Sequence, residues 1–510
     1  MGRWLLLALL TLGWGSAFAD RSTWMLRAET ITPTDLQAHL EFIASDALEG
    51  HDTPSRGLDI AGRYIVSHLQ RWGLKPAGEN GTYYQTMTYQ TATLQPTESR
   101  IEIGGRTFRY GEGFVARAVP LNTTARLVYV GDGWSHPAES LNPYEGLELQ
   151  GAIMVTLASY PEPVQEMGLE KAREMGWISP EENALKHGAV AILRVDPTDM
   201  ERIERLARFW TQRRTIVELE SRSPSVPLLV VARPVLEILF AGEPHSVAEI
   251  LQRAEEGNHV PPFALSPQKQ LSVKLSVQTT TETARNVIAY VEGADPVLKH
   301  EFVSLGAHHV GVGRADGRGD TIYNGADDNG SGSVVLLEIA EALATGARPK
   351  RSVLFLWYVG EEKGLLGSRL FTERPTVPLE NIIVNINLDM VGRSKQAGDT
   401  NPRNKDLSGL DEIFVIGPRV ASPDLGKVLE QVNSQYLNLK LNPMYSDHVN
   451  FVRKGIPALF FFSGFHEDYH RPSDHVGKID FEKMVRVART VFGLVWQLAD
   501  SPEKPARVNL

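Results

Sequence analysis

Short apolar runs, alternating with longer amphipathic stretches, are the feature that most constrains the fold of this chain of 510 residues. From about residue 285 these runs are apolar at successive positions, as in strands buried on both faces of an α/β sheet: RNVIAYVEG, HEFVSLGAH, RSVLFLWYVG, NIIVNINLDMVG and IPALFFFSG. Two other segments have the length of covering helices, SGSVVLLEIAEALA and FEKMVRVARTVFGLVWQLA. The pattern predicts an α/β fold for this part of the chain.

The beginning of the chain predicts two further helices. In TDLQAHLEFIA, Leu36, Leu40 and Ile43 recur at helical spacing. A second helix should end at Gly73, and its apolar face is formed by Leu58, Ala61, Ile65, Leu69 and Trp72.

The middle of the chain has a different texture, with short β-rich runs punctuated by Pro and Gly: ARLVYVG, GAIMVTLAS, GAVAILRV and VPLLVVA. It contains few candidate metal ligands, and its charged run MERIERLARFWTQRR is typical of a solvated helix face. We interpret it as an inserted domain. The predicted organisation is a signal peptide at 1–19, one domain in two parts at 20–114 and 276–500, the insertion at 115–275, and a tail at 501–510.

Composition narrows the possible functions. Because the chain contains no cysteine, thiolate nucleophiles, Cys-type zinc sites and iron–sulfur clusters are excluded. The net charge is −10 and no dense Lys/Arg block occurs, so we expect neither nucleic acid nor an anionic membrane as a partner.

The N-terminus predicts export, either to the periplasm or to the medium, from Arg3, the apolar run 4–14 and the cleavage site at 16–19. That run is too short to span a bilayer.

Acidic and histidine residues follow the apolar runs where strands should end. In open α/β sheets, sites form in the crevice outside the carboxyl ends of the strands, so separate segments can meet there. The candidate residues are His308, Asp327, Asp328, Glu361, Glu362, Asp389 and His470. Each acid alone is more typical of a turn or a helix cap, but the whole set suits zinc, or less well manganese or cobalt. The neighbouring Glu361 and Glu362 permit one carboxylate to bind metal while the other accepts a proton from water.

The chain resembles the M28 family of zinc-dependent exopeptidases, which includes bacterial aminopeptidases and the glutamate carboxypeptidase II group. The matching motifs are GAHH, NGADDNGSG, GEEKGLLGS, NLDMVG, YSDHVNF and YHRPSDHVGKID. The middle region is similar to a protease-associated (PA) domain through GAIMV and NALKHGAVAILRV. The resemblance implies a three-layer α/β/α fold with a mixed central sheet, plus an inserted β-rich PA domain.

When the family's site residues are transferred to the matching motifs of this chain, the resemblance implies a centre of two zinc ions. One ion would be held by His308 and Asp389, and the other by Glu362 and His470. Asp328, directly before the Asn-Gly step, would bridge both, whereas Asp327 would support the loop. Glu361 would be the general base toward a water between the ions and would later protonate the leaving amine.

The first-ligand motif departs from the family pattern. The family usually has Asp two positions after the first His, where it orients the imidazole, and here that position is Val310. Loss of such a partner typically weakens metal affinity or activity by roughly 10–100-fold, so we expect the weaker site at His308. The candidates for a replacement are His309, Asp316 and Asp320.

The favoured function is an exported dizinc aminopeptidase acting on peptides with a free N-terminus, with Tyr445 as a candidate donor to the reacting oxyanion. One alternative is an M28-type carboxypeptidase, in which Arg393 would receive the substrate carboxylate. Others are a relative of the single-zinc glutaminyl cyclases and a non-catalytic peptide-binding protein that has lost its activity. His466 and His475 flank His470, but the Tyr-His-x-Pro framing favours His470 as the ligand.

Overall fold

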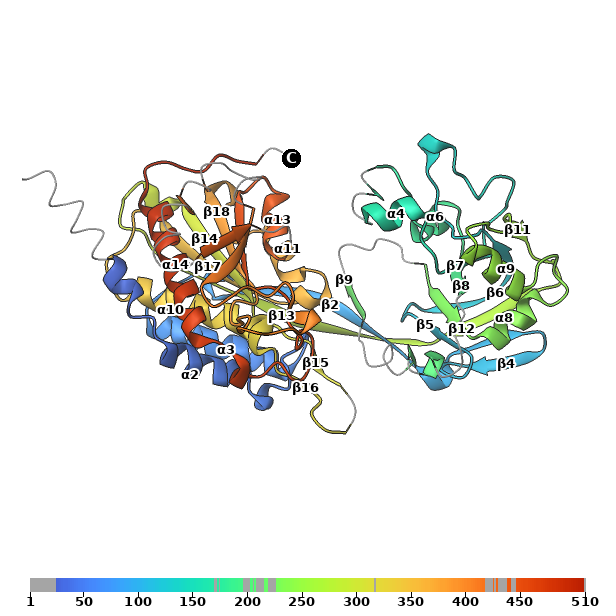
Figure 1. Ribbon diagram of the computed structural model, residues 1–510, viewed down its shortest axis with the longest axis horizontal. Helices are drawn as coiled ribbons and strands as arrows, with labels where there is room; N and C mark the ends of the chain where they lie inside the picture. The colour runs from blue at the N-terminus through green and yellow to red at the C-terminus, as the bar shows by residue number, and fades with distance from the viewer. Residues whose placement is uncertain are drawn as a thin grey trace, which may run out of the picture. The chain divides into compact units, whose positions relative to one another are not determined.

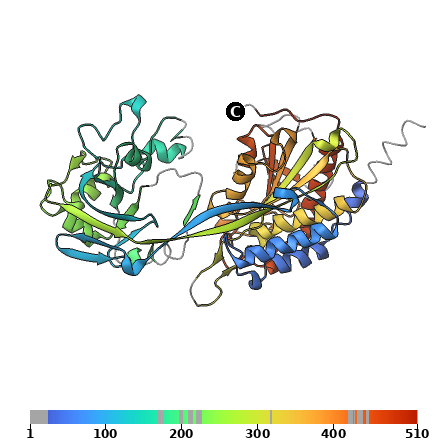
Figure 2. The same cartoon turned by 180° about the vertical axis from the view of Figure 1, so that it is seen from behind.

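The computed structural model describes residues 24–508 except for 169–171, 174, 196–201, 205, 208–214, 219–225, 316–317, 418–424, 426–427, 430–437 and 442–445. The chain divides into two compact units, Met1–Met87 with Thr283–Leu510, and Thr88–Glu282 (Figures 1 and 2). The second unit contains the predicted insertion 115–275. The predicted signal peptide lies outside the described residues. Within them, no helix has the length and apolar character needed to cross a membrane.

The first unit is built on a mixed sheet whose central strands are parallel. β14 (Phe302–His308) lies between β17 (Ser352–Tyr358) and β18 (Ile382–Leu388), and both neighbours run parallel to it. Beyond β18, the order is β21 (Ala458–Phe462), β19 (Glu412–Ile416) and β20 (Asn438–Leu441). Beyond β17, the order is β13 (Val277–Val291) and β2 (Tyr84–Leu94), and β1 (Lys75–Pro76) also pairs with β13. β9 (Thr215–Glu218), which belongs to the second unit, pairs with residues 89–92 of β2.

Both faces of this sheet are covered by helices, as the alternation of side chains along β17 requires. Val353, Phe355 and Trp357 pack into a core shared with α2 (Pro33–Ile43), α3 (Arg56–Arg71), α10 (Gly332–Ala344) and α14 (Phe481–Asp500). Leu354, Leu356 and Tyr358 pack against the opposite layer, formed by α11 (Leu366–Glu373) and α13 (His448–Val452). Because the side-chain period of a strand is two, one apolar run supplies both cores. The predicted α/β class and three-layer arrangement are confirmed.

The two predicted N-terminal helices form with local start and stop signals. Thr32 caps α2 by accepting the Asp35 N–H, and Pro33 occupies its first turn. Ser55 caps α3 in the same way through the Leu58 N–H. After α3, Gly73 takes a φ of +77°, a conformation that favours glycine past a helix end.

The second unit has its own sheet with a parallel centre formed by β6 (Leu121–Tyr129), β7 (Ile153–Leu157), β8 (Ala191–Val195) and β10 (Leu228–Val231). These strands coincide with the four predicted β-rich runs. The remaining strands are antiparallel additions: β3 (Arg100–Ile103), β4 (Arg106–Arg109), β5 (Phe114–Ala116), β11 (Phe263–Ala264) and β12 (Gln270–Leu275). Its described helices include α4 (Glu162–Met167), α6 (Pro180–Lys186), α8 (Arg233–Phe240) and α9 (Val247–Glu255). Its identity as a PA domain stays a prediction.

Candidate metal centre

The carboxyl ends of the central parallel strands bring the predicted site residues to one edge of the sheet. His308 is the last residue of β14 and pairs in register with Tyr358, the last residue of β17. Glu361 and Glu362 follow β17 in the short helix η7 (Glu361–Lys363), and Asp389 directly follows β18. Parallel strands end on the same side, so these segments meet although they are distant in sequence.

The first cluster contains His308, Glu361 and Asp389. The Nε2 atom of His308 lies 3.4 Å from Asp389 Oδ1 and 3.9 Å from Glu361 Oε2. His308 and Asp389 are buried, whereas the Glu361 side chain keeps 18% exposure. Of these three side chains, Glu361 is therefore the most accessible to solvent.

The second cluster contains Asp328, Glu362 and His470. The Nε2 atom of His470 lies 2.9 Å from Glu362 Oε2 and 3.1 Å from Asp328 Oδ2. Asp328 comes from the turn η6 (Ala326–Ser331), which leads into α10. A small pocket lined by Val312, Tyr323, Gly325 and Arg471 reaches the Asp328 and His470 side chains.

Asp328 connects the two clusters through its two carboxylate oxygens. Its Oδ1 lies 3.4 Å from His308 Nε2, and its Oδ2 is the atom near His470. A carboxylate that offers one oxygen to each of two sites has the arrangement that a bridging ligand requires. The adjacent Asp327 points elsewhere, since its Oδ2 lies 3.2 Å from His466 Nε2.

Without a metal, protons on the two rings balance part of the negative charge. Burial opposes protonation of His470, but its hydrogen bonds to Asp328 and Glu362 raise its pKa to about 10. Burial likewise opposes protonation of His308, yet Asp389 and Glu361 raise its pKa well above the ordinary value. Burial also raises the pKa of Glu361, and Asp389 adds to that shift.

The residues present fit a pair of zinc ions. Buried carboxylate oxygens of Asp328, Glu362 and Asp389 converge here on the Nε2 atoms of His308 and His470. Buried charges are normally paired or coordinate a metal, and three carboxylates gathered around two imidazoles give a donor set suited to a cation. Imidazole nitrogen and carboxylate oxygen are common zinc ligands, which agrees with the predicted cofactor.

The backbone replaces the aspartate that the first-ligand motif lacks. The Nδ1 atom of His308 lies 2.9 Å from the carbonyl oxygen of Val310, which is within hydrogen-bond distance. A carbonyl can only accept, so this bond places the ring proton on Nδ1 and leaves Nε2 free for a metal. Within the described residues, the His308 ring pairs with the Val310 carbonyl and with Asp328, Glu361 and Asp389, so neither His309 nor Asp320 serves as the replacement. Asp316, the third candidate, lies outside the described residues.

A second set of side chains supports the ligands from behind. The Ser446 hydroxyl donates to Asp389 Oδ2 at 2.8 Å and accepts from the Asn387 amide at 3.0 Å. The next residue, Asp447, is buried and accepts a hydrogen bond from Ser368. Ser446, Asp447 and His448 are all buried. The predicted oxyanion donor Tyr445 lies outside the described residues.

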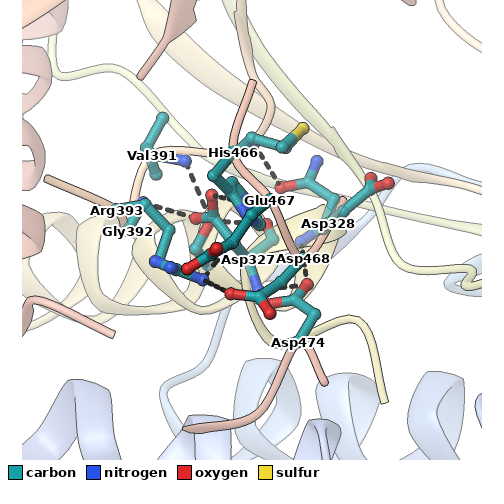
Figure 3. A network of polar contacts seen from close by, with 12 residues as sticks. Asp327, Asp328, Val391, Gly392, Arg393, His466, Glu467, Asp468 and Asp474 are labelled. Atoms are coloured by element: carbon teal, nitrogen blue, oxygen red, sulfur yellow. Dashed lines mark hydrogen bonds and ion pairs between the residues drawn. The ribbon is translucent and has the colours of Figure 1, made fainter. Parts of the chain in front are cut away.

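Arg393 and His466 belong to a buried polar network beside the centre (Figure 3). Arg393 is only 8% exposed, and its guanidinium donates to Asp468 Oδ2 at 3.0 Å. Asp327 accepts the Gly392 N–H at 2.7 Å in addition to facing His466. Sequence reasoning missed the role of Asp468 and of Asp474 here. The available signal was sequence position, since Asp474 lies inside the motif YHRPSDHVGKID that contains His470 and Asp468 directly precedes that motif.

The part of the chain that contains the two clusters matches a known peptidase family. Residues 286–495 match the family model described as "Peptidase family M28". A "Probable leucine aminopeptidase" of Trichophyton verrucosum is 27% identical over 255 residues, which cover 44% of this chain and 66% of that protein. "Aminopeptidase YwaD" of Bacillus subtilis is 30% identical over 254 residues, which cover 48% of this chain and 51% of that protein. The chain spans about half to two thirds of the length of these curated relatives.

Solved structures with the same fold extend over nearly the whole chain. An aminopeptidase from Aneurinibacillus sp. strain AM-1 has a TM-score of 0.59 at 21% identity and covers 95% of this chain and 97% of that one. BSAP, a zinc aminopeptidase from Bacillus subtilis, has a TM-score of 0.54 at 19% identity and covers 94% of this chain and 98% of that one. At these identities the likeness is one of fold. The predicted likeness to peptidase family M28 is confirmed over residues 286–495.

Proposed function

Because residues 286–495 of this chain belong to peptidase family M28, we propose that the protein is a dizinc aminopeptidase that removes residues from the free N-terminus of peptides. The names of its relatives as leucine aminopeptidase, aminopeptidase and zinc aminopeptidase support this activity. The observation that carries the proposal is the position of Asp328, with one oxygen toward His308 and the other toward His470.

The proposed mechanism assigns the ligands to one ion each. His308 and Asp389 would hold one zinc, Glu362 and His470 the other, and Asp328 both. When bound, the two ions would polarise the scissile carbonyl and make a water molecule between them more acidic.

Glu361 is the proposed proton carrier. Its carboxylate lies beside the first cluster, retains access to solvent, and is the neighbour of a ligand without itself being needed as one. Burial and the nearby Asp389 raise the pKa of Glu361, which makes it a stronger base than an exposed glutamate. Glu361 would accept a proton from the attacking water and return it to the leaving amine when the peptide bond breaks.

Observations of this chain disfavour the alternatives. A carboxypeptidase needs an accessible cation for the substrate carboxylate, but Arg393 is buried and paired with Asp468. A single-zinc cyclase does not need a carboxylate shared between two clusters. A binding protein without activity would have no reason to retain both clusters and Glu361.

The test is hydrolysis of a peptide panel by the zinc-loaded protein, with each peptide offered both free and N-acetylated. We expect cleavage of the free peptides only, and release of single N-terminal residues. Glu361→Gln keeps the shape of the side chain but removes the base, so kcat should fall by about 10²–10⁴-fold.

Two controls separate the parts of the proposal. His475→Asn changes an exposed histidine near the centre that belongs to neither cluster, and it should retain wild-type activity. Cleavage of N-acetylated peptides would exclude an aminopeptidase. Unchanged kcat in Glu361→Gln would exclude the proposed base while leaving the substrate class intact.

Export of the protein is proposed from residues 1–19 alone. N-terminal sequencing of the protein recovered from the periplasm or medium of an expressing bacterium should begin near Asp20. Recovery of an intact Met1 terminus from the cytoplasm would contradict the prediction.

A further inference from the structure

One loop supplies both a proposed zinc ligand and a carboxylate that contacts the backbone of the bridging residue. The loop follows β21 and contains His470 and, four residues later, Asp474. Asp474 is only 2% exposed. Its Oδ2 accepts the N–H groups of Asp327 at 3.0 Å and of Asp328 at 3.1 Å (Figure 3). Its backbone carbonyl accepts the N–H of Ala326 at 3.3 Å.

These contacts fix the main chain at the point from which the Asp328 side chain extends. The opposite side of the same turn is held by Asn329, whose amide donates to the Leu388 carbonyl at 2.9 Å and whose Oδ1 accepts the Met390 N–H at 3.2 Å. The turn is therefore held from β18 on one side and from Asp474 on the other. Moving either support would shift the Asp328 oxygens relative to both clusters.

The loop itself is anchored independently of Asp474. Asp468 pairs with Arg393 at 3.0 Å and with Lys478, and His466 faces Asp327. This anchoring holds His470 at a φ of 52°, a left-handed conformation that is unfavourable for a residue with a side chain. Asp474 thus joins a fixed loop to the turn that presents Asp328.

We propose that Asp474 is a positioning residue for the metal centre, which sets the distance between the bridging Asp328 and the ligand His470. The inference rests on the proposed two-zinc site. Because Asp328 contacts both clusters, loss of Asp474 should weaken both ions together rather than one of them. Removal of such supporting hydrogen bonds typically lowers metal affinity or activity by about 10–100-fold.

The experiment measures zinc affinity and stoichiometry by competition with a chelating dye, in the full-length protein and three variants. Asp474→Ala removes both acceptor atoms and should bind the two ions about 10–100-fold more weakly. Asp474→Asn keeps one oxygen that can accept both N–H groups, so its affinity should lie closer to that of the wild type. Ser473→Ala is the matched control, since its hydroxyl donates to Asp468 and does not reach residues 326–331.

A spectroscopic measurement separates positioning from general loss of stability. In cobalt-loaded protein, Asp474→Ala should alter the visible absorption of the metal, whereas Ser473→Ala should not. Circular dichroism establishes that each variant is folded at the temperature used. If Asp474→Ala does not fold, Asp474→Glu, which displaces the carboxylate by one methylene, replaces it and should also weaken both ions.

The outcomes distinguish this inference from the proposed function. A wild type that binds no zinc would overturn both. A wild type that binds two ions, with Asp474→Ala matching its affinity and cobalt spectrum, would overturn only the role of Asp474. Weakening of one ion alone in Asp474→Ala would also overturn it, because a displaced bridge must affect both.

Discussion

Zinc uptake by the metal-free protein should release protons from the two histidine rings of the candidate centre. His470 lies 2.9 Å from Glu362 and 3.1 Å from Asp328, and these hydrogen bonds raise its pKa to about 10 against the effect of burial. The pKa of His308 is also raised well above its ordinary value. His470 is therefore protonated at pH 7 and the pKa of His308 is shifted in the same direction, whereas zinc binds only the neutral imidazole.

The sign and size of the effect follow from these shifts. Because both folded pKa values are raised, a proton competes with zinc throughout the neutral range, and affinity should rise with pH. For each proton that zinc displaces, the zinc affinity should rise about tenfold per pH unit until the pH approaches the pKa of the folded protein. At pH 7, loading both sites should release about two protons. The His470 side chain is 37% exposed, so water weakens its ion pairs with Asp328 and Glu362.

The assay is titration calorimetry of zinc into metal-free protein at pH 7 in buffers with different ionisation enthalpies. The dependence of the observed enthalpy on the buffer gives the number of protons released. His470→Asn should release about one proton fewer, while His475→Asn, outside both clusters, should match the wild type. Equal enthalpies in all buffers would refute the reasoning, since they would mean that no proton leaves when zinc binds.

Three further substitutions test the supporting structure. Val310→Ala should leave zinc affinity unchanged in dye competition, because the carbonyl and not the side chain accepts from His308; weaker binding would contradict that. Trp357→Ala, in the centre of the sheet, should lower the free energy of unfolding in urea by about 3–5 kcal/mol. Asp327→Asn weakens the fully buried contact with His466 and should cost about 1–3 kcal/mol by the same method, whereas no loss would mean that the contact contributes nothing.

Much of the fold and of the candidate site could be predicted because the signals are local. In the run RSVLFLWYVG, the residues from Val353 to Val359 are apolar at successive positions, which is typical of a strand buried on both faces. The acids that follow β17 and β18 stand at strand ends, where an α/β sheet forms its sites. Glu361 and Glu362 are adjacent in sequence, and the structure directs them to different clusters. The division between base and ligand stays a prediction.

Other features could not be predicted because they depend on partners distant in sequence. Arg393 was a candidate for binding substrate, but Asp468 pairs with it in the interior, and no pattern near Arg393 indicates that. The missing aspartate of the first-ligand motif was expected to be replaced by another side chain. The actual partner of His308 is a backbone carbonyl, which every residue has and which therefore leaves no signature in the sequence.

The sequence by itself determined which residue types could meet at the sheet edge, because strand periodicity and motif order fix the local position of each acid and imidazole. Only the tertiary structure decided how they are held. The two oxygens of Asp328 reach different histidines because the turn that carries them is fixed from two distant segments. Asn329 bonds to Leu388 of β18, 59 residues away, and Asp328 bonds to Asp474, 146 residues away. Hydrogen bonds of that separation exist only after the chain has folded, so their geometry, and with it the spacing of the centre, is a property of the packed molecule.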